Sequence, residues 1–230
     1  MKKFFDYFDT RYRESILNMP LADDGPVITI SRQTGCDARQ VAENVVDNLN
    51  LKYGITKWKW VDKDIIYKIA EELNTDALRV ENFYKGIELS NASEMIMAFS
   101  GNFVSDLRVK KAIKDVVLTM CKEGFLVIVG RGGVSIAKDI TDALHIRLVA
   151  PFYWRVENVM KKLKMDIGTA EEYVVDADEK RFNLIQTFLD KKPLHIDYLF
   201  DATINRNGFT IHETAELIAC LLYTSPSPRD

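Results

Sequence analysis

The chain has 230 residues, of which 47% are hydrophobic and 28% are charged, and its formal net charge is -3. This composition is typical of a globular protein with room for one α/β domain and a hydrophobic core. A negative net charge argues against a nucleic-acid-binding surface, which needs a basic face, whereas a small anionic ligand needs only a locally basic cleft. The three cysteines are widely spaced and form no CxxC or histidine pair, so they indicate neither a disulfide framework nor a zinc site.

No stretch offers the roughly 18 uncharged apolar residues of a membrane span, so we expect a cytoplasmic protein that does not enter the membrane. Residues 1–25 are predicted to form an aromatic-rich amphipathic helix up to about Asn18, followed by a linker. This helix is expected to dock on the domain or on a second copy, as in a homodimer. Residues 26–222 are expected to form the domain. Residues 223–230 alternate Ser with Pro, and we set them aside as disordered or foreign to the native gene.

The stretch from Pro26 to Leu49 is the most informative part of the sequence. A β-branched run, Val27–Ile30, is followed by a turn that contains Gly35 and then by apolar residues at helical spacing. A strand that enters a helix through such a turn directs free backbone N–H groups and the positive end of the helix dipole at one point. The segment therefore predicts an anion site of the phosphate-loop type.

This turn lacks the lysine that a phosphate-binding loop places before a serine or threonine. Ala38 stands at the lysine position and Arg39 at the next one. A charge about 4 Å from a phosphate oxygen contributes roughly 4 kcal/mol at an effective dielectric near 20, so the missing charge has to be replaced. Arg32 and Arg39 are the available substitutes. In the alternative interpretation, Asp37 is a helix N-cap with Gln40 three residues on, and its carboxylate fills the N–H groups instead.

Four further strands are predicted from short apolar or alternating runs. They cover Trp58–Val61, Phe125–Val129, His145–Ala150 and Leu199–Ile204. Helices are predicted after the turn and over residues 62–73, 76–122, 153–163, 170–189 and 211–222. The segment 76–122, with apolar periodicity over Glu88–Phe99, is expected to be a helical insert that covers the site.

Two arginines outside the turn are candidate site residues. Ligands in open α/β sheets bind beyond the carboxyl ends of the strands, and Arg131 lies between glycines directly after the strand that ends at Val129. It has no packing reason to be there, so it is predicted to face the ligand. Arg181 lies three residues after Asp178 and shares a helical face with it, which by spacing alone indicates an intrahelical ion pair of little consequence.

The order and spacing of these segments resemble the cytidylate kinase-like family. The resemblance rests on the turn and on WVDKDIIYK, IVGRGG, HIRLVAP, YWRVENVMKKL, DADEKR and DATIN, and it covers about Val27 to Leu222. It implies a three-layer α/β fold like that of P-loop nucleoside monophosphate kinases, with a five-stranded parallel sheet, a helical insert and a lid. It also implies ATP with Mg²⁺ as the phosphoryl donor and a pyrimidine monophosphate such as CMP or dCMP as the acceptor. No residue is assigned as a metal ligand.

The resemblance also implies roles for particular residues. For the donor nucleotide it implies Ser31, Arg32, Gly35, Cys36, Asp37, Ala38, Arg39 and Gln40. For the acceptor it implies Asp62, Tyr67, Lys68, Arg131, Asp178 and Arg181, where Asp178 and Arg181 match an Asp-x-x-Arg pair that contacts the monophosphate. The expected catalytic arginines are Arg39, Arg131 and Arg155, the last at the start of the helix that leads into the lid.

Four positions depart from the family pattern. Asp37 and Ala38 replace two glycines of the loop, Val129 stands where cytidylate kinases have aspartate, and Val174 stands where they carry a lid arginine. Phosphoryl transfer depends almost wholly on positioned positive charge, so each lost cation counts against turnover. Two functions therefore stay open: an ATP-dependent phosphotransferase with an atypical loop, and a nucleotide-binding regulatory module of the same fold with weak or no catalysis.

Overall fold

A computed structural model describes residues 25–54, 56–62, 64–74, 76–85, 105–190 and 195–224. Its centre is a parallel sheet of five strands in the order β2-β3-β1-β4-β5. The strands are β1 (Val27–Arg32), β2 (Lys59–Val61), β3 (Leu126–Val129), β4 (Ala143–Val149) and β5 (Ala202–Asn205). The predicted five-stranded sheet is confirmed. Leu199 differs from the prediction because it belongs to a short 3-10 helix, η1 (Ile196–Leu199), that precedes β5.

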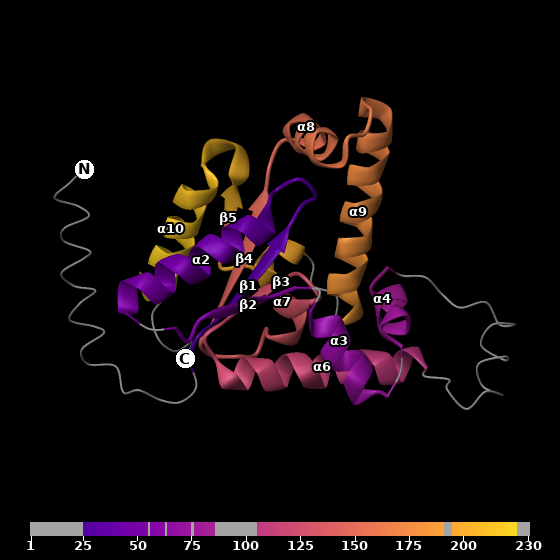
Figure 1. The fold of residues 1–230 in the computed structure, drawn as a ribbon, viewed down its shortest axis with the longest axis vertical. Helices are drawn as coiled ribbons and strands as arrows, with labels where there is room; N and C mark the ends of the chain where they lie inside the picture. Colours follow the sequence, from indigo (N-terminus) through magenta and orange to yellow (C-terminus); the bar gives the residue numbers. More distant parts are fainter. Residues whose placement is uncertain are drawn as a thin grey trace, which may run out of the picture.

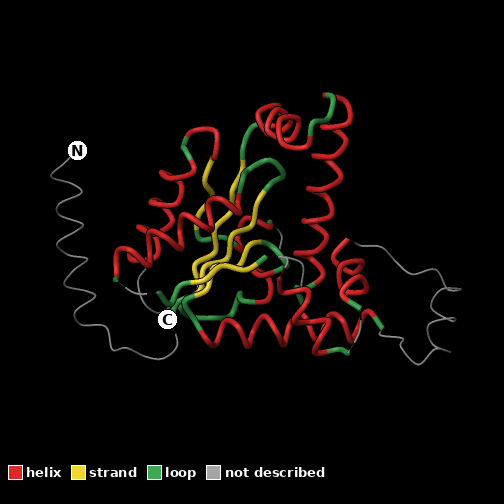
Figure 2. The backbone as a smooth tube through the Cα atoms, viewed as in Figure 1, coloured by secondary structure: helices red, strands yellow, loops and turns green. Residues whose placement is uncertain are grey.

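Helices cover both faces of the sheet and make the fold three-layered (Figure 1). The first face carries α2 (Ala38–Tyr53) and α10 (Ile211–Thr224), which pack on each other. The second face carries α3 (Asp64–Glu72), α4 (Ala77–Lys85), α6 (Asp106–Glu123) and the short α7 (Gly133–Ile136). Figure 2 shows the sheet between these two groups of helices. Central strand β1 is buried from Val27 to Ser31 because helices cover it on both sides.

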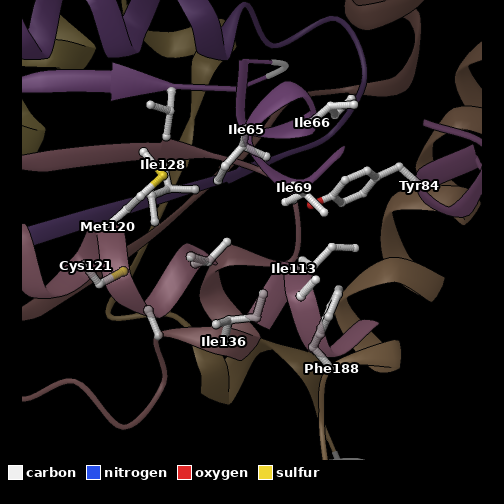
Figure 3. Close-up of a cluster of buried hydrophobic side chains, with 14 of the residues drawn as sticks. Ile65, Ile66, Ile69, Tyr84, Ile113, Met120, Cys121, Ile128, Ile136 and Phe188 are labelled. Atoms are coloured by element: carbon white, nitrogen blue, oxygen red, sulfur yellow. The ribbon is translucent and has the colours of Figure 1, made fainter. Parts of the chain in front are cut away.

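Each face has its own hydrophobic core. On the first face the predicted helical stripe of Val41, Val45 and Leu49 is fully buried against the sheet. On the second face side chains of α3 and α6, among them Ile65 and Ile113, pack against β3 (Figure 3). Burying such side chains stabilises the fold by about 1.5–3 kcal/mol each, so the two cores hold the carboxyl edge of the sheet in a fixed shape.

Two helices, α8 (Phe152–Leu163) and α9 (Ile167–Thr187), follow β4 and form a hairpin with a small core of its own. Val174 is buried in that core, together with Val156 and Ala170. This position, where cytidylate kinases carry a lid arginine, therefore serves packing in this chain. The far end of α9 is anchored on α7 because the hydroxyl of Ser135 donates to the carbonyl oxygen of Ile185 at 2.7 Å.

Several predictions fall outside the described residues. These are the N-terminal helix and its homodimer, the helix over Glu88–Phe99 and the tail from residue 225 onward. They stay predictions. Within the part that the structure describes, none of the helices is long and apolar enough to span a bilayer.

Candidate functional site

The turn between β1 and α2 is held in place by strand β4. The backbone N–H of Gln33 donates to the carbonyl of Leu148 at 2.9 Å, and its side-chain Oε1 accepts from the N–H of Ala150 at 3.1 Å. Gly35 has a φ of +90°, and a Cβ there would lie 2.7 Å from the carbonyl oxygen of Arg155. A backbone atom cannot move aside cheaply, so the close approach of α8 to the turn requires glycine.

Asp37 occupies the N-cap position of α2 in a left-handed conformation, with φ 54°, and its side chain makes no capping hydrogen bond. The capping-box interpretation is therefore wrong. The carboxylate leaves the N–H groups of α2 open because it forms an ion pair with the ammonium of Lys162. The neighbouring Cys36 is buried, and burial raises the pKa of its thiol to about 12, so it carries no negative charge at neutral pH.

Asp178 of α9 is tied to the turn. Its Oδ1 accepts from both the backbone N–H and the hydroxyl of Thr34, each at 2.6 Å. Its Oδ2 accepts from Nη1 of Arg155 at 2.6 Å. Arg181 completes the group by donating to the Thr34 hydroxyl and, at 3.4 Å, to Asp178. Asp178 and Arg181 are thus more than an intrahelical pair, because they join α9 to a turn 144 residues earlier in the chain.

Arg155 is packed against the turn and does not line the cleft described below. Its side chain is 7% exposed, and its guanidinium donates to the carbonyls of Ala150 and Thr34 as well as to Asp178. One turn further along α8, the Asn158 amide donates to the carbonyl of Gly35 at 3.1 Å. These contacts show how α8 shapes the turn.

A cleft of about 720 Å³ opens at the carboxyl edge of the sheet, between the turn, the loop after β3 and the α8–α9 hairpin. Six cationic side chains and two carboxylates line it. They are Arg32, Arg39, Arg131, Lys162, Lys180 and Arg181 on the cationic side, and Asp37 and Asp62 on the anionic side. A cleft with this imbalance concentrates positive potential even though the whole chain is negative. It therefore suits a polyanionic ligand.

The loop after β3 brings Arg131 into the cleft through an unusual backbone. Gly130, Arg131 and Gly132 have φ values of 71°, 56° and 71°. Left-handed backbone costs roughly 1–2 kcal/mol at a residue with a Cβ, so the loop holds Arg131 against a local preference. Such strain is common at functional sites and persists where the surrounding structure determines it.

Asp62 joins this loop to α2 at the floor of the cleft. Its side chain is 3% exposed, and its two oxygens accept from Nε of Arg39 at 2.5 Å and from Nε of Arg131 at 3.1 Å. The guanidinium of Arg131 also lies 4.8 Å from the ring centre of Tyr84, within the range of a cation–π contact. The two predicted catalytic arginines in the cleft are thus held around one buried carboxylate.

Arg32 is the least satisfied cation of the cleft. Its Nη1 lies over Gly130, 1.8 Å from where a Cβ would stand. Among the described residues its guanidinium has no hydrogen-bond or ion-pair partner. Burial, and then repulsion from Arg181, Arg131 and Arg39, lower the pKa of Arg32 to about 10, with only Asp62 opposing. An anion that binds beside this guanidinium would stabilise it.

The structure brings together most of the predicted site residues but not all of them. Tyr67 and Lys68 lie exposed on α3 and do not line the cleft. The residues that line the cleft or shape the turn without having been predicted include Thr34, Tyr84, Lys162 and Lys180. Tyr84 is buried, its hydroxyl has no hydrogen-bond partner in the described chain, and burial raises its pKa. The basic run at the end of α8 was the one signal for Lys162, and it does not say which lysine faces the cleft.

The sheet order, the open strand-turn-helix and the helical hairpin over a cationic cleft define a protein of the P-loop kinase fold class. The model of the cytidylate kinase-like family matches residues 27–207, and the chain belongs to that family. This confirms the family and the fold expected from the sequence.

Two solved structures are similar in fold. An uncharacterized protein from Eubacterium ventriosum superposes with a TM-score of 0.57 at 19% identity, covering 86% of this chain and 97% of that one. A shikimate kinase from Acinetobacter baumannii, in complex with shikimate, superposes with a TM-score of 0.50 at 14% identity, covering 89% and 96%. A protein named uronate isomerase, from Corynebacterium glutamicum, is 24% identical over 132 residues, which are 57% of this chain and span only 25% of that relative.

Proposed function

We propose that this protein is an ATP-dependent phosphotransferase that acts on a small nucleotide such as CMP or dCMP. The observation that carries the proposal is the cleft with six cations against two carboxylates, next to helix N–H groups that the carboxylate of Asp37 does not fill. Phosphoryl transfer needs little covalent chemistry from the protein and depends on positioned positive charge. Membership of a kinase-like family supports the same reaction class.

The donor side of the site would be the turn and the start of α2. The residues present fit a triphosphate: the N–H groups of α2 are open to an anion, and Arg32 lacks a hydrogen-bond partner within the described chain. No set of three or more His, Cys, Asp or Glu side chains in the described segments is placed to hold a metal. Mg²⁺ in kinase sites is held mainly by phosphate oxygens and one or two carboxylates, and the cleft offers Asp37 and Asp62.

The acceptor side would lie around Asp62, Arg131 and Tyr84. Arg131 offers a fixed guanidinium for a monophosphate, and the buried hydroxyl of Tyr84 has hydrogen-bonding capacity to spare. In the reaction, an oxygen of the acceptor phosphate would bond to the terminal phosphorus of ATP while the bond from that phosphorus to the bridging oxygen breaks, and ADP leaves. The chain's own residues would hold the two anions together against their repulsion.

The test is a coupled assay of ADP release with a panel of nucleoside monophosphates, alongside calorimetric titration with ATP and Mg²⁺. We expect micromolar ATP binding, and turnover that is highest with CMP or dCMP. The variant that separates the two substrates is Arg131→Lys, which keeps the charge but cannot form the bidentate contact with a phosphate. Its turnover with the acceptor should fall while ATP binding stays within about threefold of the wild type. Absence of ATP binding would exclude the proposal.

A second candidate, a nucleotide-binding regulatory module, is supported by one specific observation. Asp178 already occupies the N–H of Thr34 in the turn, and Arg39, Arg131 and Lys162 are each paired with a carboxylate. Internal carboxylates at these points would compete with a transferring phosphate. ATP binding with no detectable phosphate transfer to any monophosphate would favour this candidate over the enzyme.

A further inference from the structure

Lys162 reaches the phosphate turn from a distant part of the chain. It lies near the end of α8, half-exposed, and its ammonium forms an ion pair with Asp37, 125 residues earlier. The same nitrogen lies 3.4 Å from Oε1 of Gln40. Both acceptors belong to the N-cap and first turn of α2, on either side of Ala38, where a phosphate loop would carry its lysine. The ammonium of Lys162 therefore places a positive charge close to position 38, where the sequence has no lysine.

The residues predicted to replace that lysine point elsewhere. Arg39 turns toward Asp62 at the other side of the cleft, and Arg32 extends over Gly130 in the loop after β3. Arg155 is engaged with backbone carbonyls and Asp178. Of the cleft's cations, Lys162 is the one with contacts to both Asp37 and Gln40.

The chemistry of this contact leaves room for a ligand. An ammonium has three N–H donors, and the contacts with Asp37 and Gln40 use two of them. A cation at the N-terminus of a helix is electrostatically unfavourable unless an anion accompanies it. Asp37 supplies that anion, so it holds Lys162 at a helix end that would otherwise repel it. A phosphate oxygen at the same helix end would be attracted by the N–H groups and by the third donor of Lys162.

We propose that Lys162 supplies, from α8, the phosphate-binding cation that the turn lacks at Ala38, and that Asp37 is its positioning residue. The inference rests on the proposed binding of ATP in the cleft. It gives a reason for two departures from the family pattern together, since the carboxylate at position 37 and the missing lysine at position 38 belong to one arrangement. It also predicts that α8 contributes directly to affinity for the outer phosphates of the donor.

A neighbouring lysine provides a matched control. Lys161 precedes Lys162 on the same helix, is 74% exposed, and pairs with Glu157 at 3.8 Å on the outer face. It does not line the cleft. Removing either lysine changes the net charge by the same amount, so a difference between the two variants reports position and not overall charge.

The experiment uses the full chain with Asp37 in place, because Asp37 positions Lys162. It adds the double variant Asp37→Asn/Lys162→Ala, because removing Lys162 alone also uncovers the carboxylate of Asp37 beside the phosphates. Asparagine tolerates the left-handed backbone at position 37. ATP binding is titrated calorimetrically with Mg²⁺ for the wild type, Lys162→Ala, Lys161→Ala and Lys162→Arg, and for Asp37→Asn with and without Lys162→Ala. A charge-assisted hydrogen bond contributes about 1.5–3 kcal/mol, so the Lys162→Ala member should bind ATP at least about tenfold more weakly than its parent.

The Lys161→Ala member should bind within about twofold of its parent, and the Lys162→Arg member should retain most of the affinity. Melting curves confirm that each variant folds, as expected for substitutions at exposed or half-exposed lysines. Equal ATP affinity with and without Lys162, or an equal loss at Lys161, would overturn the inference while leaving ATP binding intact. A wild-type chain that binds no ATP would instead overturn the proposed function, and the inference with it.

Discussion

Two loops at the carboxyl edge of the sheet, the turn after β1 and the loop after β3, have similar backbones but carry charged side chains of opposite sign. Each places one residue with a side chain in left-handed backbone, Asp37 in the first and Arg131 in the second. Each pairs that residue with a counter-charge from elsewhere, Lys162 for Asp37 and Asp62 for Arg131. The first loop thus presents backbone N–H groups beside a cation from α8, Lys162, and the second presents a cation of its own, Arg131.

The difference lies in what supports each loop. The turn after β1 depends on the α8–α9 hairpin, through Arg155 and Asp178, whereas the loop after β3 rests on the packed second face of the sheet. Gly133, at the end of that loop, lies against Ile128 of β3, where a Cβ would be 3.0 Å from Cγ2. The comparison indicates that the proposed donor side of the cleft is coupled to the hairpin and that the proposed acceptor side is supported by the core of the second face.

The largest expected effect comes from breaking the support of the first loop. In Arg155→Met the side chain keeps its bulk, but Oδ2 of Asp178 and the carbonyl of Thr34 lose the guanidinium that donates to them. Loss of one partner of a buried ion pair costs about 3–5 kcal/mol. We expect the free energy of unfolding, measured by urea denaturation, to fall by that order, and ATP affinity to fall with it.

Lys161→Met is the control for that change, because its ion pair is exposed and worth only about 0.3–0.5 kcal/mol. If Arg155→Met were as stable as Lys161→Met, the turn would not depend on the hairpin, and the contrast between the two loops would be lost.

A smaller effect is expected in the second loop, from two substitutions that remove the same cation. Arg131→Ala and Arg131→Gly both abolish the contact with Asp62, but only glycine relieves the left-handed backbone. The glycine variant should therefore be more stable than the alanine variant by about 1 kcal/mol, measured by chemical denaturation. Both should lose acceptor binding equally. A more stable alanine variant would show that the backbone at Arg131 is not strained.

A change of similar size, but of opposite sign, is expected at Arg32, which lies between the loops. Replacing it with methionine removes a cation that burial and three arginines disfavour, so the ligand-free protein should gain roughly 1 kcal/mol of stability. ATP affinity should fall at the same time. A loss of stability on Arg32→Met would show that Arg32 is a structural residue.

The lowered pKa of Arg32 also makes the stability of the fold and the proposed ATP binding depend on pH. Because the lowered pKa lies near 10, we expect the folded state to release this proton before the unfolded state does. The destabilising charge should then be present below about pH 10 and be relieved as the pH rises through it. ATP binding should weaken over the same range because the cation disappears. The Arg32→Met variant should lack this step in a titration of binding against pH.

Much of the fold could be predicted from the sequence because the relevant signals are local. The β-branched run at Val27–Ile30 and the helical spacing of Val41, Val45 and Leu49 predicted β1 and α2, and the glycines around Arg131 marked the end of β3. These features depend on neighbouring residues, whose periodicity reports which face of an element is buried. The family resemblance came from the order of such segments and was confirmed.

The charge pairing in the site was decided only by the tertiary structure. Sequence reasoning offered Arg32 and Arg39 as substitutes for the missing cation and overlooked Lys162. In the fold Arg39 turns to Asp62 and Arg32 extends over Gly130. The alternative interpretation made Asp37 a competing cap, whereas in the fold Asp37 pairs with Lys162 on α8. The physical reason is that the positions of strands, turns and helix ends are determined mainly by residues close together in the sequence. The partner of a charged side chain depends instead on how distant helices pack around it.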